Sequence, residues 1–372
     1  MANPVLTGAV LIEANGAALN NAGQDEGRRA ENAIVVKQIR IGRLRYPYVS
    51  GQAWRRWWRE VLYADFGWTP SPLTVISKPQ QAFTAGNPIH FEEDDLFGYM
   101  AARKRAKKGK KEAGESEEKA AEGGEGTFRR ISPLKNSLLI SVLPNVIESD
   151  FGHLSRHQQD PEKRLSEQAR SQAPLLYESE HYTTCLQGVF TISLADVGRF
   201  EVGEMYDVPE DLIQQNNDLL IRDSASDRVY YLKRDERIKR VQEALQALAR
   251  LRGGAHLARN LSDVVPVAVL VGFLDGGNAP FQRLFDPDEN YERARLNLGR
   301  LRSVLEDYKD RLLAGEGKAI YFGYRPTVLA DEEEMLAALR NESPFSECIE
   351  VVGTPQQALE KAGGRVKAVM EM

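Results

Sequence analysis

The amino-acid sequence predicts an α+β fold, and three observations support this prediction. Strand-like apolar runs and amphipathic helical patterns occur together along the chain. The C-terminal end has a β-α-β order. The 372 residues are 42% hydrophobic and 28% charged, which is an ordinary globular composition for one large domain or two modest ones. A ferredoxin-like (RRM-like) sheet with large insertions fits this pattern.

The N-terminal part begins with a strand over residues 5–14, which is apolar on both faces. Residues 15–28 are rich in Asn, Gly and Ala and are predicted to form a loop, and residues 33–41 form a second strand. Ser50 is a good N-cap for a helix over about 51–64. This helix carries an apolar stripe at helical spacing, so its tryptophans are predicted to belong to the core rather than to a base-stacking surface. The stripe consists of Trp54, Trp57, Trp58, Val61 and Leu62.

The middle of the chain contains a low-complexity segment. Residues 101–127 have almost no apolar content and are predicted to form a disordered surface insertion. Order resumes at Arg129, and residues 137–143 are expected to form a strand. Residues 149–171 are polar, and a strand pair is predicted around 183–194.

The C-terminal part alternates helices and strands. An amphipathic helix over 233–252 is expected to stop at Gly253-Gly254, and residues 264–274 form a strongly apolar strand. The remaining elements are predicted as helices over 291–313, 331–341 and 355–362 and strands over 319–326, 349–353 and 365–370.

The charge is distributed unevenly. The chain has a net charge of −5, which by itself argues against nucleic-acid binding. Residues 28–59, however, hold nine basic residues and one acidic residue, which gives +8 for that segment and −13 for the rest. A basic island in an acidic protein suits a phosphate backbone, although a solvated set of arginines would give the same pattern.

Nothing in the sequence predicts a membrane span, a metal site or a disulfide framework. No run of 18 apolar residues and no signal peptide is seen, and the two cysteines, Cys185 and Cys348, have no CxxC partner. We therefore expect a cytoplasmic protein in a reducing compartment, without membrane contact. Nucleotide-binding, zinc-protease and serine-hydrolase motifs are missing, so no catalytic residue, metal or cofactor is expected.

Three further features could in principle bind a metal ion or a phosphate. His153 and His157, at i and i+4, would share a helix face as metal ligands, but their segment has loop character. The acidic run 92–95 is read as a helix N-terminal turn or a solvated loop rather than a cation site. The Asn15–Asn21 loop and the turn 47–52 combine small residues, amides and a helix N-terminus that favour close approach to phosphates and 2′-hydroxyls.

Several motifs carry a family resemblance. They are EANGAALNNAG after the first strand, YPYVSGQAWRRWWRE, FRRISPLKNSLLISV, and the helix ending LRGGAHLAR. Together they resemble the Cas-seven backbone family of type I CRISPR surveillance complexes, in its DevR autoregulator and archaeal Csa subfamilies. The resemblance is strongest over residues 5–63, covers 129–195 and 233–275 less closely, and does not include the 101–127 insertion.

The resemblance implies a modified RRM palm with large helical and thumb-like insertions. Residues 1–65 and 183–372 would form the palm, and residues 66–182 an inserted subdomain with a thumb-like segment around 153–170. The implied partners are CRISPR RNA, target DNA through the guide, copies of the same chain, other Cascade subunits, and a helicase-nuclease or transposition partner. The implied RNA contacts are Asn15, Asn20, Asn21, Lys37, Arg40, Arg43, Arg45, Ser50, Gln52, Arg55, Arg56, Arg129, Arg130, Lys135, His256 and Arg259.

Two enzymatic alternatives stay open at this point. Backbone subunits of the similar type III complexes use an acidic residue after the first strand to cut target RNA, and Asp25 has about that position. A guide-processing ribonuclease could instead use acid-base chemistry at His153 or His256. A transcription regulator, which the subfamily name suggests, would need a helix-turn-helix signal that this sequence lacks.

Overall fold

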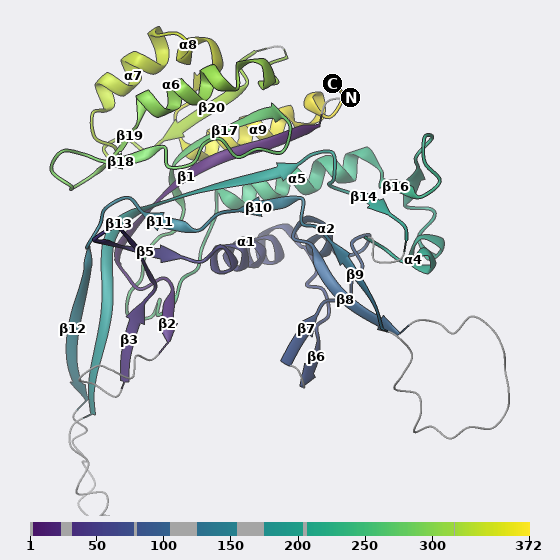
Figure 1. The fold of residues 1–372 in the computed structure, drawn as a ribbon, viewed down its shortest axis with the longest axis horizontal. Helices are drawn as coiled ribbons and strands as arrows, with labels where there is room; N and C mark the ends of the chain where they lie inside the picture. The colour runs from purple at the N-terminus through teal and green to yellow at the C-terminus, as the bar shows by residue number, and fades with distance from the viewer. Residues whose placement is uncertain are drawn as a thin grey trace, which may run out of the picture.

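A computed structural model describes residues 3–23, 32–77, 80–104, 125–154, 175–203, 207–315 and 317–372. The fold is α+β, as predicted, and is organised around a large mixed sheet (Figure 1). Its main path has the order β21-β20-β17-β1-β13-β11-β5-β4. In chain order these strands are β1 (Pro4–Ala17), β4 (Gln38–Ile41), β5 (Leu44–Val49), β11 (Leu139–Ser141), β13 (Leu175–Ser193), β17 (Pro266–Asp275), β20 (Ile320–Tyr324) and β21 (Ile349–Val351).

Four more strands branch from this path. They are β2 (Asn21–Gly23), β3 (Asn32–Val36), β10 (Leu134–Asn136) and β12 (Ile147–Leu154). All except β2, which pairs with β3, pair with the long strand β13. Because β12 and β13 stay paired over eight residues, from Ile147 opposite Tyr182 to Leu154 opposite Leu175, they form a ribbon that extends away from the body (Figure 1).

Both faces of the central sheet are covered. The side chains of Leu6, Val10 and Ile12 on β1 join one core with helices α1 (Gly51–Phe66), α5 (Arg234–Leu248) and α9 (Pro355–Val369). Ala9 and Leu11, on the opposite face, join a second core with α6 (Leu298–Asp307), α7 (Glu332–Asn341) and α8 (Phe345–Cys348). Within the described residues, the central strand β1 therefore offers no open face of the kind on which RRM domains stack bases.

Helix α1 follows the sequence prediction. Ser50 is its N-cap, and the Ser50 side chain accepts a hydrogen bond from the Ala53 N–H at 3.3 Å. All five residues of the predicted stripe are buried. Trp54 and Trp58 stack with ring centroids 5.7 Å apart, and Trp58 donates to the Ala244 carbonyl of α5 at 2.7 Å. The tryptophans are core residues, as predicted.

Several predicted boundaries are wrong. The second strand is broken at Lys37, so that β3 and β4 form in place of one strand. The Lys37 N–H donates to the Asn20 carbonyl, and the Lys37 carbonyl accepts from the Tyr48 N–H. The pair expected at 183–194 is the single strand β13. The helix expected over 291–313 is α6, preceded by β19 (Ala294–Leu296) and followed by a 3-10 turn (Lys309–Arg311). Helix α5 ends at Leu248, before the glycine pair.

The predicted last strand, residues 365–370, is also wrong, because α9 continues to Val369. Leu359, Ala362, Val366 and Val369 are buried at steps of three or four, which is one continuous helix stripe. The apolar residues of this segment belong to that stripe rather than to the alternation of a strand.

The remaining elements form smaller units beside the sheet. They are β6 (Thr74–Ser77), β7 (Gln80–Phe83), α2 (Glu92–Leu96), β8 (Tyr99–Lys104), β9 (Glu125–Arg130), β14 (Arg199–Glu201), α4 (Glu210–Gln215), β15 (Leu220–Arg222), β16 (Val229–Leu232) and β18 (Phe285–Pro287). The segment predicted as disordered, 101–127, contributes its two ends to the β8–β9 hairpin. Its middle, 105–124, lies outside the described residues.

The acidic run 92–95 begins α2, in agreement with the predicted helix N-terminal turn, but Glu93, Asp94 and Asp95 are buried rather than solvated. Asp95 is fully buried and accepts hydrogen bonds from Arg130 and Arg240, the second at 2.7 Å. Arg130 is itself 5% exposed and also donates to the carbonyls of Asp95, Asp196 and Arg199. These ion pairs fasten α2 and β9 to helix α5. Among the described residues, no helix is long and apolar enough to cross a membrane.

Candidate nucleic-acid interface

The predicted site residues that come together lie where β1, β5 and α1 meet. The Ser50 N–H donates to Asn20 Oδ1 at 2.9 Å, and the Lys37 N–H donates to the Asn20 carbonyl at 2.9 Å. Asn20 thus joins the loop after β1, the start of β4 and the N-terminus of α1. Because a helix N-terminus offers free N–H groups and a positive end, this junction is chemically suited to a phosphate.

The loop 253–262 borders the same junction. The Ala255 N–H donates to the Leu19 carbonyl at 3.1 Å, and the Asn260 side chain donates to the Gly16 carbonyl at 2.9 Å. The Gly253-Gly254 pair, predicted as a helix stop, has another role. A Cβ at Gly253 would lie 2.3 Å from the Trp57 ring, so a glycine is required for the loop to pass over α1.

His256 is the centre of a small polar cluster. Its Nε2 lies 2.6 Å from Asn21 Nδ2, and its Nδ1 lies 3.3 Å from Arg259 Nη2. Both neighbours are N–H donors, so the ring must offer a lone pair, which a doubly protonated ring does not have. Burial, and then the charge of Arg259, lower the pKa of His256. The cluster therefore favours a neutral imidazole.

The β4–β5 hairpin is amphipathic. Arg40 faces Arg45 across the two strands, and Ile41 faces Leu44. Arg45 shares its face with Val49, which packs in the core beneath α1, because side chains alternate along a strand. Arg40 and Arg45 therefore lie on the α1 side of the sheet, the side of the Asn20–Ser50 junction. Arg43 is exposed in the turn of the hairpin.

Two neighbouring arginines of helix α1 point to different sides of the helix. Gln52 and Arg56 are exposed, and Arg56 makes an i,i+4 ion pair with Glu60 at 2.8 Å. Arg55 points inward instead. Its guanidinium donates to the carbonyls of Leu134 and Phe97 and to the side chains of Asn136 and Ser132 at 2.7–3.0 Å. Burial, and then the charge of Arg59, lower the pKa of Arg55 to about 10.

The other predicted residues are dispersed. Arg55 and Arg130 both donate to protein groups, and Arg130 is buried while Arg55 is half-buried. Arg129 is exposed on the β8–β9 hairpin, and Lys135 is exposed on β10, opposite Thr191 of β13. Asn15 is exposed, and its N–H donates to the Ser262 hydroxyl at 3.3 Å. The sequence prediction missed Asn260 and Ser262, and the only signal for them was their place in the polar loop after the glycine pair.

The structure describes only some of the residues on which the two enzymatic alternatives depend. Asp25 and His157 lie outside the described residues. His153 belongs to strand β12 and not to a helix, so it does not begin the helix face that metal ligation together with His157 would need. Within the described ranges, no group of three or more His, Cys, Asp or Glu side chains is arranged to hold a metal ion.

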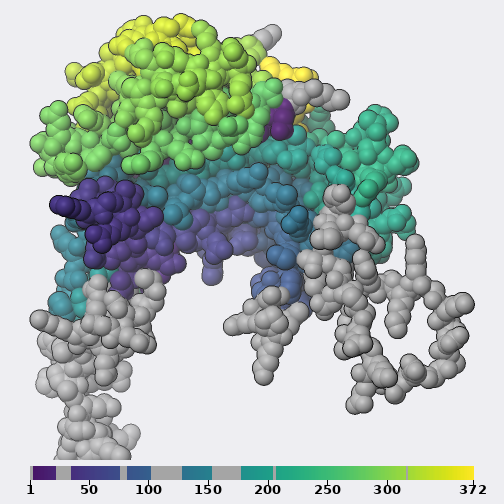
Figure 2. Space-filling model, in the orientation of Figure 1, coloured from purple at the N-terminus to yellow at the C-terminus, as the bar shows by residue number. Residues whose placement is uncertain are grey.

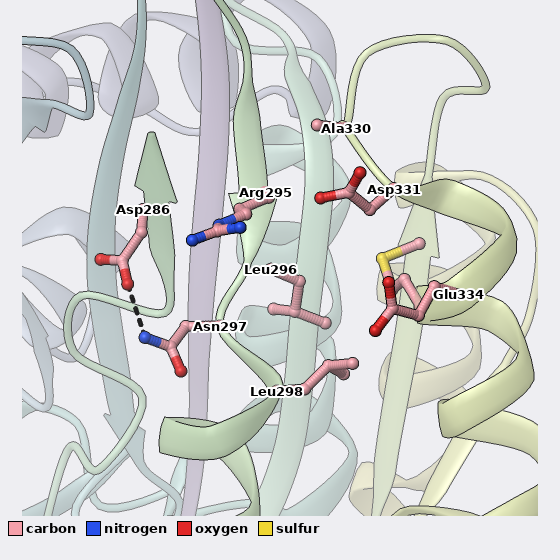
Figure 3. A pocket seen from close by; sticks show the side chains of 9 residues that line it. Asp286, Arg295, Leu296, Asn297, Leu298, Ala330, Asp331 and Glu334 are labelled. Carbon is pink, nitrogen blue, oxygen red and sulfur yellow. Dashed lines mark hydrogen bonds between the residues drawn. The ribbon is translucent and has the colours of Figure 1, made fainter. Parts of the chain in front are cut away.

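A cavity of about 240 Å³ lies between the β18–β19 hairpin and α7 (Figure 3). Asp286, Asp331 and Glu334 line it together with one cation, Arg295. Asn297 donates to Asp286, and Asn297 also caps α6. Three carboxylates against one guanidinium repel a phosphate, so this cavity does not extend the candidate interface.

The candidate interface therefore consists of the Asn20–Ser50 junction, the His256 cluster, the exposed face of α1 and the arginine face of the β4–β5 hairpin. In Figure 2 the purple N-terminal segments, which hold most of these residues, form the lower left and lower middle of the molecule.

The fold is similar to that of one chain of known structure. One chain of a solved "CRISPR RNA-guided surveillance complex, pre-nicking" superposes with a TM-score of 0.50 and 10% identity, and the match covers 97% of this chain and 100% of that chain. A chain of a "CRISPR RNA-guided surveillance complex" has a TM-score of 0.48 at 10% identity, over 97% and 98% of the two chains. No curated protein matches the sequence. The model of the family "CRISPR-associated negative auto-regulator DevR/Csa2" matches residues 8–292, and the chain belongs to this CRISPR-associated family.

Proposed function

We propose that this protein binds CRISPR RNA as a repeated backbone subunit of a type I surveillance complex. Successive copies would cover the guide and leave its bases available for pairing with target DNA. Sequence recognition would then be a property of the base pairs, while the protein holds the RNA backbone. The proposal agrees with family membership and with the surveillance-complex fold.

The observation that carries the proposal is the convergence at Asn20. One side chain and one carbonyl hold together the N-terminus of α1, the start of β4 and the loop after β1. Arg40 and Arg45 lie on the same side of the sheet, and Arg56 and Gln52 extend the polar surface along α1. Such a combination of a helix N-terminus, amides and arginines matches RNA phosphates and 2′-hydroxyls.

Charge supports the same conclusion. The chain has an overall net charge of −5, yet most of the interface lies in residues 28–59, which carry a net charge of +8. A phosphate backbone would be attracted to this segment more than to the rest of the chain, which carries a net charge of −13.

We further propose that the chain acts as a non-catalytic subunit in the cytoplasm, alongside other Cascade subunits and, through the complex, a helicase-nuclease or a transposition partner. The assembled complex should leave complementary RNA intact in the presence of Mg²⁺, and the isolated chain should leave a repeat-containing precursor intact. Guide-spaced cuts that disappear in Asp25→Ala would instead identify a target-RNA nuclease.

The direct test is binding of a repeat-spacer RNA by the purified chain, measured by fluorescence anisotropy over a range of salt concentrations. The affinity should fall linearly on a log-log plot against salt, because neutralised phosphates release counterions. RNA should bind more tightly than DNA of the same sequence if 2′-hydroxyls are contacted. Salt-independent binding, or no binding, would refute the proposal.

A further inference from the structure

The loop that follows helix α5, residues 253–262, lies tightly on the surface that we assign to RNA. A Cβ at Gly254 would lie 2.7 Å from Leu19 Cδ2, and a Cβ at Gly253 would lie 2.3 Å from the Trp57 ring. The two glycines therefore let the loop rest directly on α1 and on the residues that follow β1. Its position relative to the candidate interface is fixed by packing.

Leu261 is the most exposed large apolar side chain in the part of the chain that the structure describes. Its exposed fraction is 81%. Both of its neighbours are tied to the loop after β1. The Asn260 side chain donates to the Gly16 carbonyl at 2.9 Å. The Ser262 hydroxyl accepts from the Asn15 N–H at 3.3 Å. Because the chain is held on each side of Leu261, this apolar side chain is presented to solvent at a defined place in the interface.

The groups around Leu261 favour a nucleotide. Arg259, two residues earlier, is exposed and lies 3.3 Å from the His256 ring. The nearest carboxylate along the chain is Asp263, which lies 3.9 Å from the Arg325 guanidinium, so its charge is partly offset. The Cα atoms of Arg259 and Leu261 are at most about 7 Å apart. One nucleotide can therefore place its phosphate at Arg259 and its base at Leu261.

A single exposed leucine between polar groups is the right size for a nucleobase. Nucleobases have apolar faces, and side chains such as Leu, Ile, Phe and Met insert between base steps in proteins that bend nucleic acids. A stable protein–protein contact needs about 800 Å² from each partner, far more than one side chain supplies. The polar residues on either side of Leu261 extend no apolar surface that would complete such a contact.

We propose that Leu261 packs against the face of one guide base and separates that base from its neighbour. The inference deepens the proposed function and rests on it. Arg259 and the Asn20–Ser50 junction would hold phosphates, while Leu261 determines where along the strand a base leaves the stack. Because the contact is apolar, it adds affinity without counterion release, and it does not depend on the identity of the base.

The experiment uses the full chain and a short RNA, which accommodates one copy. A set of these RNAs carries one 2-aminopurine at successive positions, and the fluorescence of this base rises when it leaves the stack. Anisotropy gives the affinity and its salt slope. The variants are Leu261→Ser, which removes the apolar side chain, and Leu261→Met, which keeps one of similar size. Ile221→Ser is the matched control, because Ile221 is 55% exposed on β15, in the separate three-stranded sheet.

The unchanged protein should raise the fluorescence at one position of the set. Leu261→Ser should lose this rise and about tenfold in affinity. Its salt slope should be unchanged, because no phosphate contact is removed. Leu261→Met and Ile221→Ser should keep both the rise and the affinity. All three variants should unfold at the urea concentration of the unchanged protein, since the substituted side chains are exposed.

Several results would overturn the inference. One is a fluorescence rise and an affinity that are unchanged in Leu261→Ser. A lowered salt slope in Leu261→Ser, or loss of the rise in Leu261→Met, would show that the substitutions disturb the loop instead. Normal fluorescence, with loss of another Cascade subunit from the purified complex, would assign Leu261 to a protein partner. If the unchanged protein bound the RNA but raised the fluorescence at no position, this inference would fail alone. If it bound no RNA, the proposed function would fail too.

A double-mutant cycle tests how Leu261 is held. Asn260→Ala removes the hydrogen bond to the Gly16 carbonyl and leaves Leu261 in place. It should weaken RNA binding and reduce the fluorescence rise, because the loop no longer fixes the leucine. In the double variant, Asn260→Ala with Leu261→Ser, the loss of binding free energy should be smaller than the sum of the two single losses, since both act through one contact. Full additivity would contradict a base contact that depends on the anchored loop.

Discussion

Asn20 Oδ1 accepts the Ser50 N–H at 2.9 Å, and this hydrogen bond fixes the N-terminus of α1 against the loop after β1. Asn20→Ala leaves a partly buried N–H without its acceptor and should cost about 1–2 kcal/mol of unfolding free energy. RNA affinity should fall as well, because the helix N-terminus loses its position. Urea unfolding and anisotropy measure the two effects, and Asn341→Ala is the control, since Asn341 is exposed at the end of α7 and far along the chain from the predicted contacts. Equal RNA affinity in Asn20→Ala would remove the junction from the interface.

Arg55 and Arg56 should behave differently although they are neighbours. Arg55→Met removes four hydrogen bonds to protein groups and should lower stability by about 2–3 kcal/mol. Arg56→Gln breaks an exposed ion pair and should change stability by no more than about 0.5 kcal/mol. Arg56→Gln should instead reduce the salt slope of RNA binding by about 1. The reverse pattern would place Arg55 in the RNA interface.

The arginine face of the hairpin gives a third prediction. Arg40→Gln with Arg45→Gln should reduce the salt slope of RNA binding by about 2, with stability within about 0.5 kcal/mol, because both side chains are exposed. The control removes the same charge elsewhere, with Arg222→Gln and Arg302→Gln, whose partners are Asp227 and Glu342. An equal loss of slope in the control would show that net charge, rather than position, governs binding.

His256 gives a pH dependence with a defined sign. Its pKa in the folded protein is below the ordinary value of 6.5, so the unfolded chain binds more protons when the pH falls through 6.5. Stability should therefore decrease as the pH falls below about 6.5, until the folded ring also takes a proton. His256→Gln should remove this part of the pH dependence, as measured by urea midpoints between pH 5 and 8. An unchanged profile would contradict the neutral cluster.

The buried ion pairs of α2 predict a stability effect without an RNA effect. Asp95→Asn leaves Arg130 and Arg240 without their shared carboxylate in a fully buried site, which should cost about 3–5 kcal/mol. Under conditions where the variant is folded, short-RNA affinity should equal that of the unchanged protein. A selective loss of RNA affinity would connect this network to the interface.

The sequence was informative where a local rule decides the structure. The Ser50 cap and the tryptophan stripe predicted α1 correctly, because a helix stripe has a defined spacing and a cap a defined chemistry. The last helix was predicted as a helix followed by a strand, because the short apolar run 365–370 fits both the spacing of a helix stripe and the alternation of a strand. The position of Leu359 and Ala362 on the same buried face shows that the helix continues.

The candidate site was only partly predictable. Arg55 and Arg56 look alike in sequence, and only tertiary contacts show that the first is enclosed by Leu134, Asn136 and Phe97. The same holds for Arg130, whose sequence context suggests a surface cation but which pairs with the buried carboxylate of Asp95. Arg40 and Arg45 could not be placed on one face until their register across the hairpin was known.

The mass of the native complex tests the central claim most directly. The purified protein, measured with a repeat-spacer RNA and again after ribonuclease treatment, should give a series of masses separated by one protomer of 41.7 kDa on one RNA. The series should collapse when the RNA is digested, and it should shorten when the RNA is shortened. A single mass that does not depend on RNA, or a complex that holds no RNA, would contradict the account.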